Sequence, residues 1–236
     1  MIRPDFYLRS SIGGRENNED ACLAKSKCKR HLFVVADGLG GHKDGQIASR
    51  TAVNTIADFL WQSAKNEITD AIEIASEAVR AEQEKHSSRM KTTVAAAYYN
   101  GDQLVFAHVG DTRIYAFSNG KISFRTVDHS ASQLAVFAGE ITEDQIRGHV
   151  DRNLLIRTIG AKDAAKADVT VATDTQYDAL LLCTDGFWEY VLENEMEETL
   201  AQSRSAKDWI KAMTEIHASR APSDCDNNSA IAVIAR

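Results

Sequence analysis

Two early segments of the chain carry hydrophobic residues at a helical period. Within residues 46–63 and 67–85, mostly apolar side chains return every three or four positions, which places them on one face of a helix. These faces are formed by Ile47, Thr51, Ala52, Ile56, Phe59 and Leu60 in the first segment and by Ile68, Ala71, Ile72, Ala75, Ala78 and Val79 in the second. The pattern predicts two amphipathic helices that cover a flat surface.

A different pattern, short runs rich in β-branched, aromatic and other apolar residues, predicts strands. Asn100-Gly101 and Asn119-Gly120 lie between such runs, and both dipeptides favour two-residue hairpin turns. We therefore expect an antiparallel meander in the middle of the chain and no parallel βαβ winding. The predicted strands span residues 32–36, 92–99, 103–109, 112–117, 121–127, 179–183 and 229–235.

Two more helices are expected late in the chain, over residues 189–202 and 206–219. Helices on both sides of a strand-rich centre indicate an α+β fold in which helices pack on the outside of antiparallel sheets. The chain has 236 residues, two prolines and no Gly/Ser-rich tract. No linker divides it, so we expect one domain over residues 1–236.

Charge and cysteine content narrow the classes of protein. A formal net charge of -7 argues against a nucleic-acid partner, which requires a basic surface. Cys22, Cys28, Cys183 and Cys225 show no CxxC or other zinc-ligand spacing, which fits a reduced intracellular protein. No apolar run approaches the roughly 18 residues of a membrane helix. We expect a soluble cytoplasmic protein without a membrane partner.

Aspartates recur where predicted strands begin or end. Asp37, Asp111 and Asp185 follow apolar runs, and Asp226 comes just before the last one. One reading is that aspartate favours turns. The other is that strand ends converge on one site, because a lone carboxylate at the end of a buried strand is costly unless it is paired or bound to a metal. Oxygen ligands of this kind suit Mg²⁺ and Mn²⁺.

A glycine-rich stretch, DGLGGHKDG over residues 37–45, comes before the first predicted helix. It lacks the GxxxxGK[ST] pattern of a Walker A loop. Glycines at left-handed positions predict a tight turn here, and we expect this turn to bring the Gly38 carbonyl beside Asp37.

Seven short motifs occur in the order typical of one enzyme family. They are GRENNED (14–20), VADGLGG (35–41), KTT (91–93), VGDTRIY (109–115), DHS (128–130), TDG (184–186) and DNNS (226–229). Together they cover nearly the whole chain and resemble the metal-dependent protein phosphatases of type 2C, the PPM family, in its short bacterial form. This resemblance implies a four-layer αββα sandwich, two antiparallel sheets flanked by pairs of helices.

The resemblance also implies a site with two cations, Mn²⁺ or Mg²⁺. In such a site Asp37 bridges the cations, the Gly38 carbonyl and the carboxylates of Asp185 and Asp226 complete the ligands, and Glu19 and Asp20 hold metal-bound waters. Arg15 binds the substrate phosphate. Asp111 would share a third ion with Asp185, or it could merely pair with Arg113 or cap a turn.

The activity implied is hydrolysis of phosphoserine and phosphothreonine on proteins by a metal-activated water. The implied partners are phosphorylated proteins, including a cognate bacterial serine/threonine kinase and its substrates. The enzyme is expected to be a monomer. Residues 130–155 resemble the variable flap beside the cleft of the family. A catalytically silent binding module and a small-molecule phosphohydrolase remain as alternative functions.

Two positions depart from the family pattern. Leu39 stands where animal relatives carry a histidine proposed as a general acid, so water is expected to protonate the leaving alkoxide. Asn228 occupies a place that is often apolar, and we expect it to alter only packing.

Overall fold

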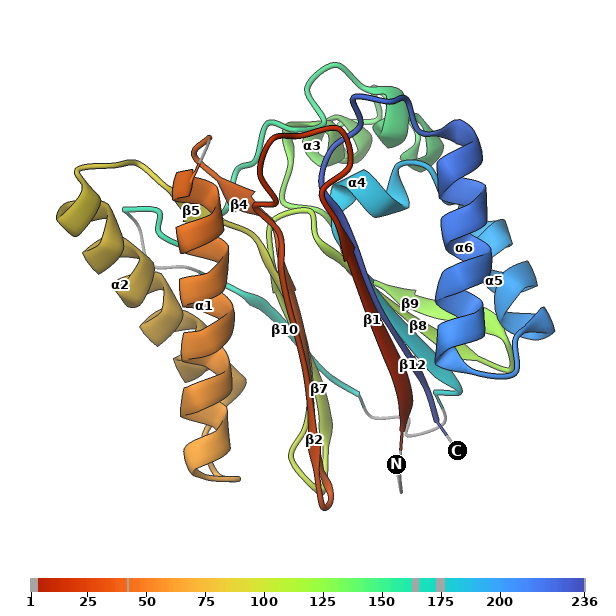
Figure 1. Ribbon diagram of the computed structural model, residues 1–236, viewed down its shortest axis with the longest axis horizontal. Coiled ribbons are helices and arrows are strands. Elements are labelled where there is room, and N and C mark those ends of the chain that lie inside the picture. Colours follow the sequence, from red (N-terminus) through yellow and green to blue (C-terminus); the bar gives the residue numbers. More distant parts are fainter. Residues whose placement is uncertain (1–3, 42, 163–165, 173–176, 236) are drawn as a thin grey trace.

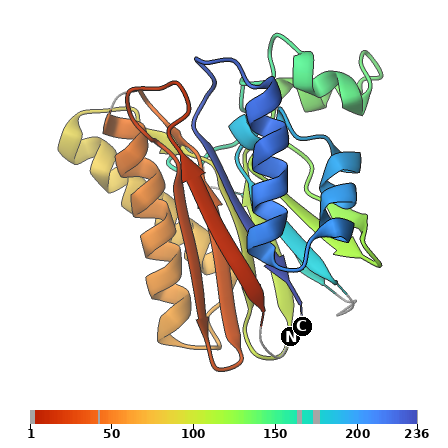
Figure 2. The same ribbon diagram turned by 45° about the vertical axis from the view of Figure 1, so that its right-hand side comes forward.

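The computed structural model describes residues 4–41, 43–162, 166–172 and 177–235. Two five-stranded sheets pack face to face, and helices cover the outer face of each (Figure 1). Every strand pair is antiparallel. The turned view in Figure 2 shows the helices remaining outside the two sheets. The predicted αββα sandwich is confirmed.

The first sheet has the strand order β10-β7-β6-β3-β2 and is covered by α1 and α2. A two-stranded ribbon, β4 with β5, lies beside the start of α1. The bounds of these elements are β2 Ala21–Lys27, β3 Arg30–Ala36, β4 Gly38–Leu39, α1 Lys43–Gln62, α2 Ile68–His86, β5 Lys91–Thr92, β6 Val94–Tyr99, β7 Leu104–Val109 and β10 Asp168–Ala172.

The second sheet has the order β1-β12-β11-β8-β9 and is covered by α5 and α6. Between β9 and β10 the flap contributes α3 and a short 3₁₀ helix, η1, at one end of the sandwich (Figure 1). The bounds are β1 Asp5–Ser11, β8 Arg113–Ser118, β9 Lys121–Arg125, α3 Ala131–Phe137, η1 Glu143–Gly148, β11 Ala179–Cys183, α4 Asp185–Trp188, α5 Glu193–Gln202, α6 Ala206–Arg220 and β12 Asn228–Ile234.

The side chains of the central strands alternate between the helix-covered face of their sheet and the face that packs on the other sheet. In β3, Leu32 and Val34 pack toward the helices, whereas Phe33 and Val35 pack toward the other sheet. Successive side chains of a strand point to opposite faces, so a strand buried on both sides reads as one apolar run. This is why the central strands are recognisable in the sequence.

Both hairpins predicted in the middle of the chain are confirmed, but the continuous meander is wrong. β6 pairs with β7 in the first sheet, and β8 pairs with β9 in the second. The chain crosses between the sheets at Gly110, whose φ is 102°. A Cβ at this position would lie 2.5 Å from Thr93 Cγ2, so the crossing requires glycine.

Three strands of the two five-stranded sheets were not predicted, and neither was the two-residue β4. β1, β2 and β10 are edge strands, and none of them is an uninterrupted buried run. Edge strands expose polar side chains to solvent and therefore carry a weak hydrophobic pattern.

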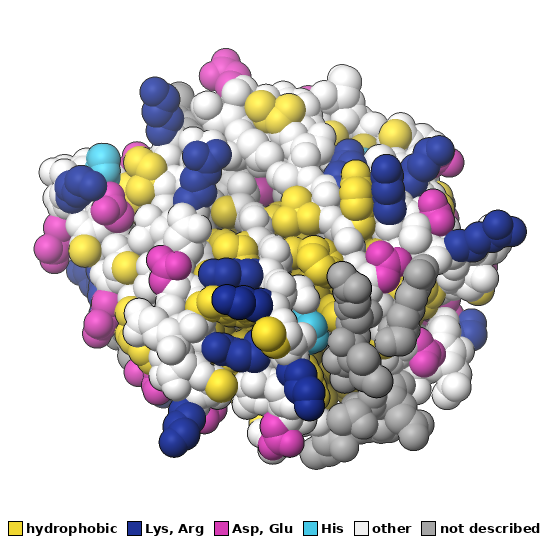
Figure 3. All heavy atoms as spheres, turned by 60° about the horizontal axis from the view of Figure 1, so that its bottom comes forward, with side chains coloured by type: hydrophobic (Ala, Val, Ile, Leu, Met, Phe, Trp, Pro, Cys, Tyr) yellow, Lys and Arg dark blue, Asp and Glu magenta, His cyan; other side chains and the backbone are white. Residues whose placement is uncertain are grey.

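The start of β1 and the end of β12 lie at the end of the sandwich opposite the flap (Figure 1). Figure 3 shows this end, where lysine and arginine side chains surround exposed apolar ones and acidic side chains are scattered. Among the described residues, no helix has the length and apolar character needed to cross a membrane.

Candidate active site

Four aspartates from strand ends meet at the flap end of the sandwich. Asp37 follows β3 and Asp111 follows β7 in one sheet, while Asp185 follows β11 and Asp226 comes before β12 in the other. Neighbouring strands run antiparallel, so the end of β11 lies beside the start of β12. All four side chains line one pocket of about 450 Å³.

The pocket also receives Arg15, Glu19 and Gly38, so seven of the eight residues predicted for the site line it. The eighth, Asp20, is not among the lining residues. Its side chain is buried, and its Oδ2 accepts a hydrogen bond of 3.1 Å from Thr184 Oγ1.

Asp37 is held on both sides of its peptide by the two threonines of the KTT motif. Its N–H donates to Thr93 Oγ1 at 3.0 Å, and its carbonyl accepts from Thr93 N–H at 2.9 Å and from Thr92 Oγ1 at 2.7 Å. Because the backbone is fixed at three points, the side chain of Asp37 has a defined direction into the pocket.

The glycines that follow Asp37 and Asp185 allow close backbone approach. A Cβ on Gly38 would lie 2.1 Å from the carbonyl oxygen of Gly45, and one on Gly186 would lie 2.2 Å from that of Asn227. Neither position accepts a larger residue without moving backbone. The glycines therefore bring together the segments that carry the acidic groups.

Asp111 is placed by the glycine turn before it. Gly110 accepts a hydrogen bond from His129 N–H at 2.9 Å and donates its own N–H to His129 Nδ1 at 3.1 Å. The predicted alternative that Asp111 pairs with Arg113 is wrong, because Asp128 Oδ1 and Oδ2 bind Arg113 Nε and Nη2 at 2.9 and 2.7 Å. The side chain of Asp111 instead faces the pocket.

His129 also belongs to a group with His108 and Asp168 whose ligand atoms lie within 4.8 Å of one another. Arg157 Nη1 already binds Asp168 at 2.7 Å. When one ring nitrogen of a histidine binds a metal, the other normally carries a proton and donates it to a hydrogen bond. His129 Nδ1 accepts a hydrogen bond instead and therefore carries no proton. This group therefore fits a structural hydrogen-bond network better than a metal.

Burial and mutual repulsion dominate the electrostatics of the site. Burial, and to a lesser extent neighbouring carboxylates, raise the pKa of Asp20 to about 7 and that of Asp185 to about 6. For the same two reasons the pKa values of Asp37 and Asp111 lie well above the ordinary range. Crowded carboxylates need positive charge nearby if all are to ionise.

Two arginines supply part of that charge. Arg15, with a half-exposed side chain, binds Asp226 through Nε and Nη2 at 3.1 and 2.9 Å. Arg152 of the flap lies 4.0 Å from Asp185 Oδ2 and 2.7 Å from Glu189 Oε2. Sequence reasoning missed Arg152, because its position on a variable loop gives no spacing relative to the acidic motifs.

Two asparagines in the last motif organise the surrounding loop. Asn227 Oδ1 accepts from Glu19 N–H at 2.7 Å, so it fixes the segment that carries Glu19. Asn228 was expected to affect only packing, which is wrong. Its Oδ1 accepts from Arg9 Nη1 at 2.6 Å, and its Nδ2 donates to the carbonyl of Asp226 at 3.1 Å.

The donor set fits hard divalent cations. Carboxylates and a backbone carbonyl are the ligands that Mg²⁺ and Mn²⁺ prefer. In the described structure, Asp20 Oδ1 and Asp185 Oδ1 are buried without a hydrogen-bond partner. A buried charged oxygen without a partner is costly, and a cation at this point would remove the cost.

Comparisons with known proteins agree with this chemistry. The pattern of the family "Protein phosphatase 2C" matches residues 9–226. The serine/threonine phosphatase stp of Listeria welshimeri is 34% identical over 203 residues, which are 81% of this chain and 80% of that protein.

Two solved structures share the fold. Serine/threonine phosphatase Stp1 from Staphylococcus aureus superposes with a TM-score of 0.88 at 25% identity, over 100% of this chain and 96% of that one. The catalytic domain of the serine/threonine protein phosphatase PstP, solved in complex with two manganese ions, superposes with a TM-score of 0.81 at 24% identity, over 98% of this chain and 97% of that one.

Proposed function

Because the chain belongs to the protein phosphatase 2C family of metal-dependent serine/threonine phosphatases, we propose that its acidic pocket binds two divalent cations, Mn²⁺ or Mg²⁺. The observation that carries the proposal is the convergence of four aspartates from both sheets on one pocket. Asp37, Asp185, Asp226 and the Gly38 carbonyl would hold the cations.

When bound, the two cations supply the positive charge that activates a water molecule for in-line attack on phosphorus. Glu19 and Asp20 would hold water beside them. Thr92 and Thr93 keep the backbone of Asp37 in place. We further propose that a third, weaker ion binds between Asp111 and Asp185, because both residues line the pocket and their carboxylates would repel each other unless a cation lies between them.

Arg15 is proposed to bind the phosphoryl group of the substrate. Its guanidinium already donates to both carboxylate oxygens of Asp226 at the pocket. A phosphoryl group also presents two oxygens, which the planar guanidinium can bind in the same way. Leu39 lines the pocket but has no proton to give, so the leaving alkoxide takes its proton from water.

The enzyme acts on phosphoproteins. Its substrates are proposed to include a cognate serine/threonine kinase and that kinase's own substrates, since a kinase must supply the phosphoryl groups that this enzyme removes. We also propose that it acts as a monomer, because residues of a single chain build the whole described pocket.

One comparison of substrates tests this function. Mn²⁺-dependent phosphate release is measured from a phosphothreonine peptide, from sugar phosphates and from nucleotides, at equal concentrations. We expect the peptide to be hydrolysed with the highest kcat/KM. Faster release from a sugar phosphate or a nucleotide would instead favour a small-molecule phosphohydrolase.

A further inference from the structure

Trp188 connects two segments that carry acidic residues of the pocket. It lies on α4 three residues after Asp185, and its side chain is fully buried. Its indole Nε1–H donates a hydrogen bond of 2.9 Å to the backbone carbonyl of Asp111. The backbone at Asp111 therefore depends on where this indole ring lies.

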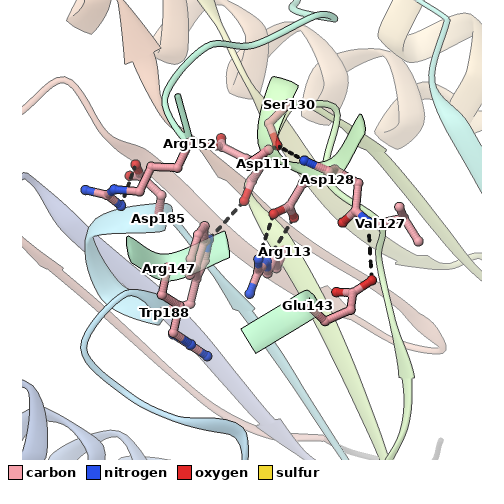
Figure 4. Close-up of polar contacts among 12 residues, drawn as sticks. Asp111, Arg113, Val127, Asp128, Ser130, Glu143, Arg147, Arg152, Asp185 and Trp188 are labelled. Atoms are coloured by element: carbon pink, nitrogen blue, oxygen red, sulfur yellow. Dashed lines mark hydrogen bonds and ion pairs between the residues drawn. The ribbon is translucent and has the colours of Figure 1, made fainter. Parts of the chain in front are cut away.

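Two arginine side chains contact the ring of Trp188 (Figure 4). The guanidinium carbon of Arg113 lies 3.6 Å from the ring centroid, and that of Arg147 lies 5.5 Å away. Arg113 is buried in an ion pair with Asp128 and forms part of the fixed core. Arg147 belongs to η1 of the flap, so the ring meets the core through one arginine and the flap through the other.

Charge pairs attach the flap to the rest of the molecule. Arg147 Nη2 binds Glu193 Oε2 at 2.6 Å, Arg152 binds Glu189 at 2.7 Å, and Glu143 pairs with Arg125. Of residues 130–155, all of which the structure describes, Ile146 is the one fully buried apolar side chain, and Val136 and Ile141 pack partly buried against the same cluster. Little apolar burial and several ion pairs are typical of an element that opens at low free-energy cost.

We propose that Trp188 is a positioning residue that links the flap to Asp111. The contacts run from Arg147 to the ring and from the indole N–H to the carbonyl of Asp111. A docked flap then holds Asp111 in the position that binds the weaker ion. This inference rests on the proposed function, in which Asp111 is a ligand. The competing explanation is that Trp188 only fills the core beneath α5 and α6.

The matched control for Trp188 is Trp209. Trp209 is also fully buried in the same apolar cluster, and its Nε1–H donates to the backbone carbonyl of Met196 at 3.0 Å. Trp188→Phe and Trp209→Phe therefore each remove one buried N–H donor and leave an aromatic ring. Only the first change removes a contact to Asp111.

The test is calorimetric titration with Mn²⁺, together with phosphothreonine-peptide turnover as a function of Mn²⁺ concentration. For Trp188→Phe we expect the weakest Mn²⁺ site to lose affinity by about tenfold or more, the usual cost of removing a group that orients a metal ligand. The Mn²⁺ concentration for half-maximal turnover should rise with it. Trp209→Phe should match wild type in both measurements.

A second variant approaches the link from the flap and needs no metal. Arg147→Met removes the guanidinium from the ring, and in ¹⁵N-labelled metal-free protein it should shift the indole N–H resonance of Trp188 but not that of Trp209. If Trp188→Phe does not fold, Arg147→Met carries the test, and it should weaken the same Mn²⁺ site.

If the Mn²⁺ titrations of Trp188→Phe and Trp209→Phe both coincide with that of wild type, the link between the flap and Asp111 is overturned and the proposed function stands. An unmoved Trp188 resonance in Arg147→Met would also overturn it. A wild-type protein that binds no Mn²⁺ would overturn the proposed function, and the link with it.

Discussion

Removing divalent metal should make the protein lose stability as the pH rises. The carboxyl of Asp20 is buried, and its pKa is raised from 3.8 to about 7. The native state therefore holds a proton that the unfolded chain releases above pH 4, so stability falls between about pH 4 and 7. At about 1.4 kcal/mol per pH unit, this single group costs about 4 kcal/mol at high pH.

Coupling among the carboxylates prevents their individual costs from adding, so we take about 4 kcal/mol for the whole site. For a chain of this size, 1 kcal/mol changes the melting temperature by roughly 2–4 °C. A comparison of pH 5 with pH 8 crosses only about two pH units of this window, which is about 3 kcal/mol. Metal-free protein should therefore melt on the order of 10 °C lower at pH 8 than at pH 5. Mn²⁺ should restore the loss at pH 8 and have little effect at pH 5.

Thermal melts with EDTA and with Mn²⁺, recorded at each pH, measure this effect. Buried histidines act in the opposite sense: burial lowers the pKa values of His108, His129 and His217, so their contribution is present above about pH 6.5 and is lost in acid. Taking the Mn²⁺-minus-EDTA difference at each pH cancels this contribution. A difference in melting temperature that stays constant from pH 5 to 8 would refute the reasoning.

Two substitutions test other parts of the account. Arg15→Ala should raise KM for a phosphothreonine peptide more than it lowers kcat, because the guanidinium binds phosphate in both the ground state and the transition state; unchanged kinetics would make Arg15 a surface residue. Asp128→Asn leaves the buried guanidinium of Arg113 without its anion and should cost about 3–5 kcal/mol of unfolding free energy. Denaturant titration measures that cost, and a loss below about 1 kcal/mol would show that the pair is not buried in solution.

Much of the fold was predictable because its central elements are buried. The helices predicted over 46–63 and 67–85 correspond to α1 and α2, and the apolar runs at 32–36 and 179–183 correspond to β3 and β11. The edge strands β1, β2 and β10 were missed because many of their side chains are exposed or half-buried, which leaves no uninterrupted apolar run. The crossing between sheets at Gly110 was missed because a local pattern does not show which sheet a hairpin joins.

The four aspartates of the site could be proposed from sequence because each lies beside an apolar run, whereas Glu19 and Asp20 were proposed from the family resemblance alone. Trp188 and Arg152 could not, since their roles depend on contacts between segments distant in the chain. Trp188 reaches Asp111 across 77 positions. Arg152 reaches Asp185 from a loop whose sequence has no periodic pattern. Neither contact leaves a local signal of residue type or spacing.

The central claim is that aspartate-bound cations drive phosphopeptide hydrolysis, and Asp37→Asn tests it most directly. The control is Asp102→Asn, which changes an exposed aspartate in the β6–β7 turn. Phosphate release from a phosphothreonine peptide is measured for wild type and both variants, with Mn²⁺ and after EDTA. We predict that wild type and Asp102→Asn are active only with Mn²⁺, and that folded Asp37→Asn loses nearly all turnover. Full turnover by Asp37→Asn, or by wild type after exhaustive EDTA treatment, would contradict the claim.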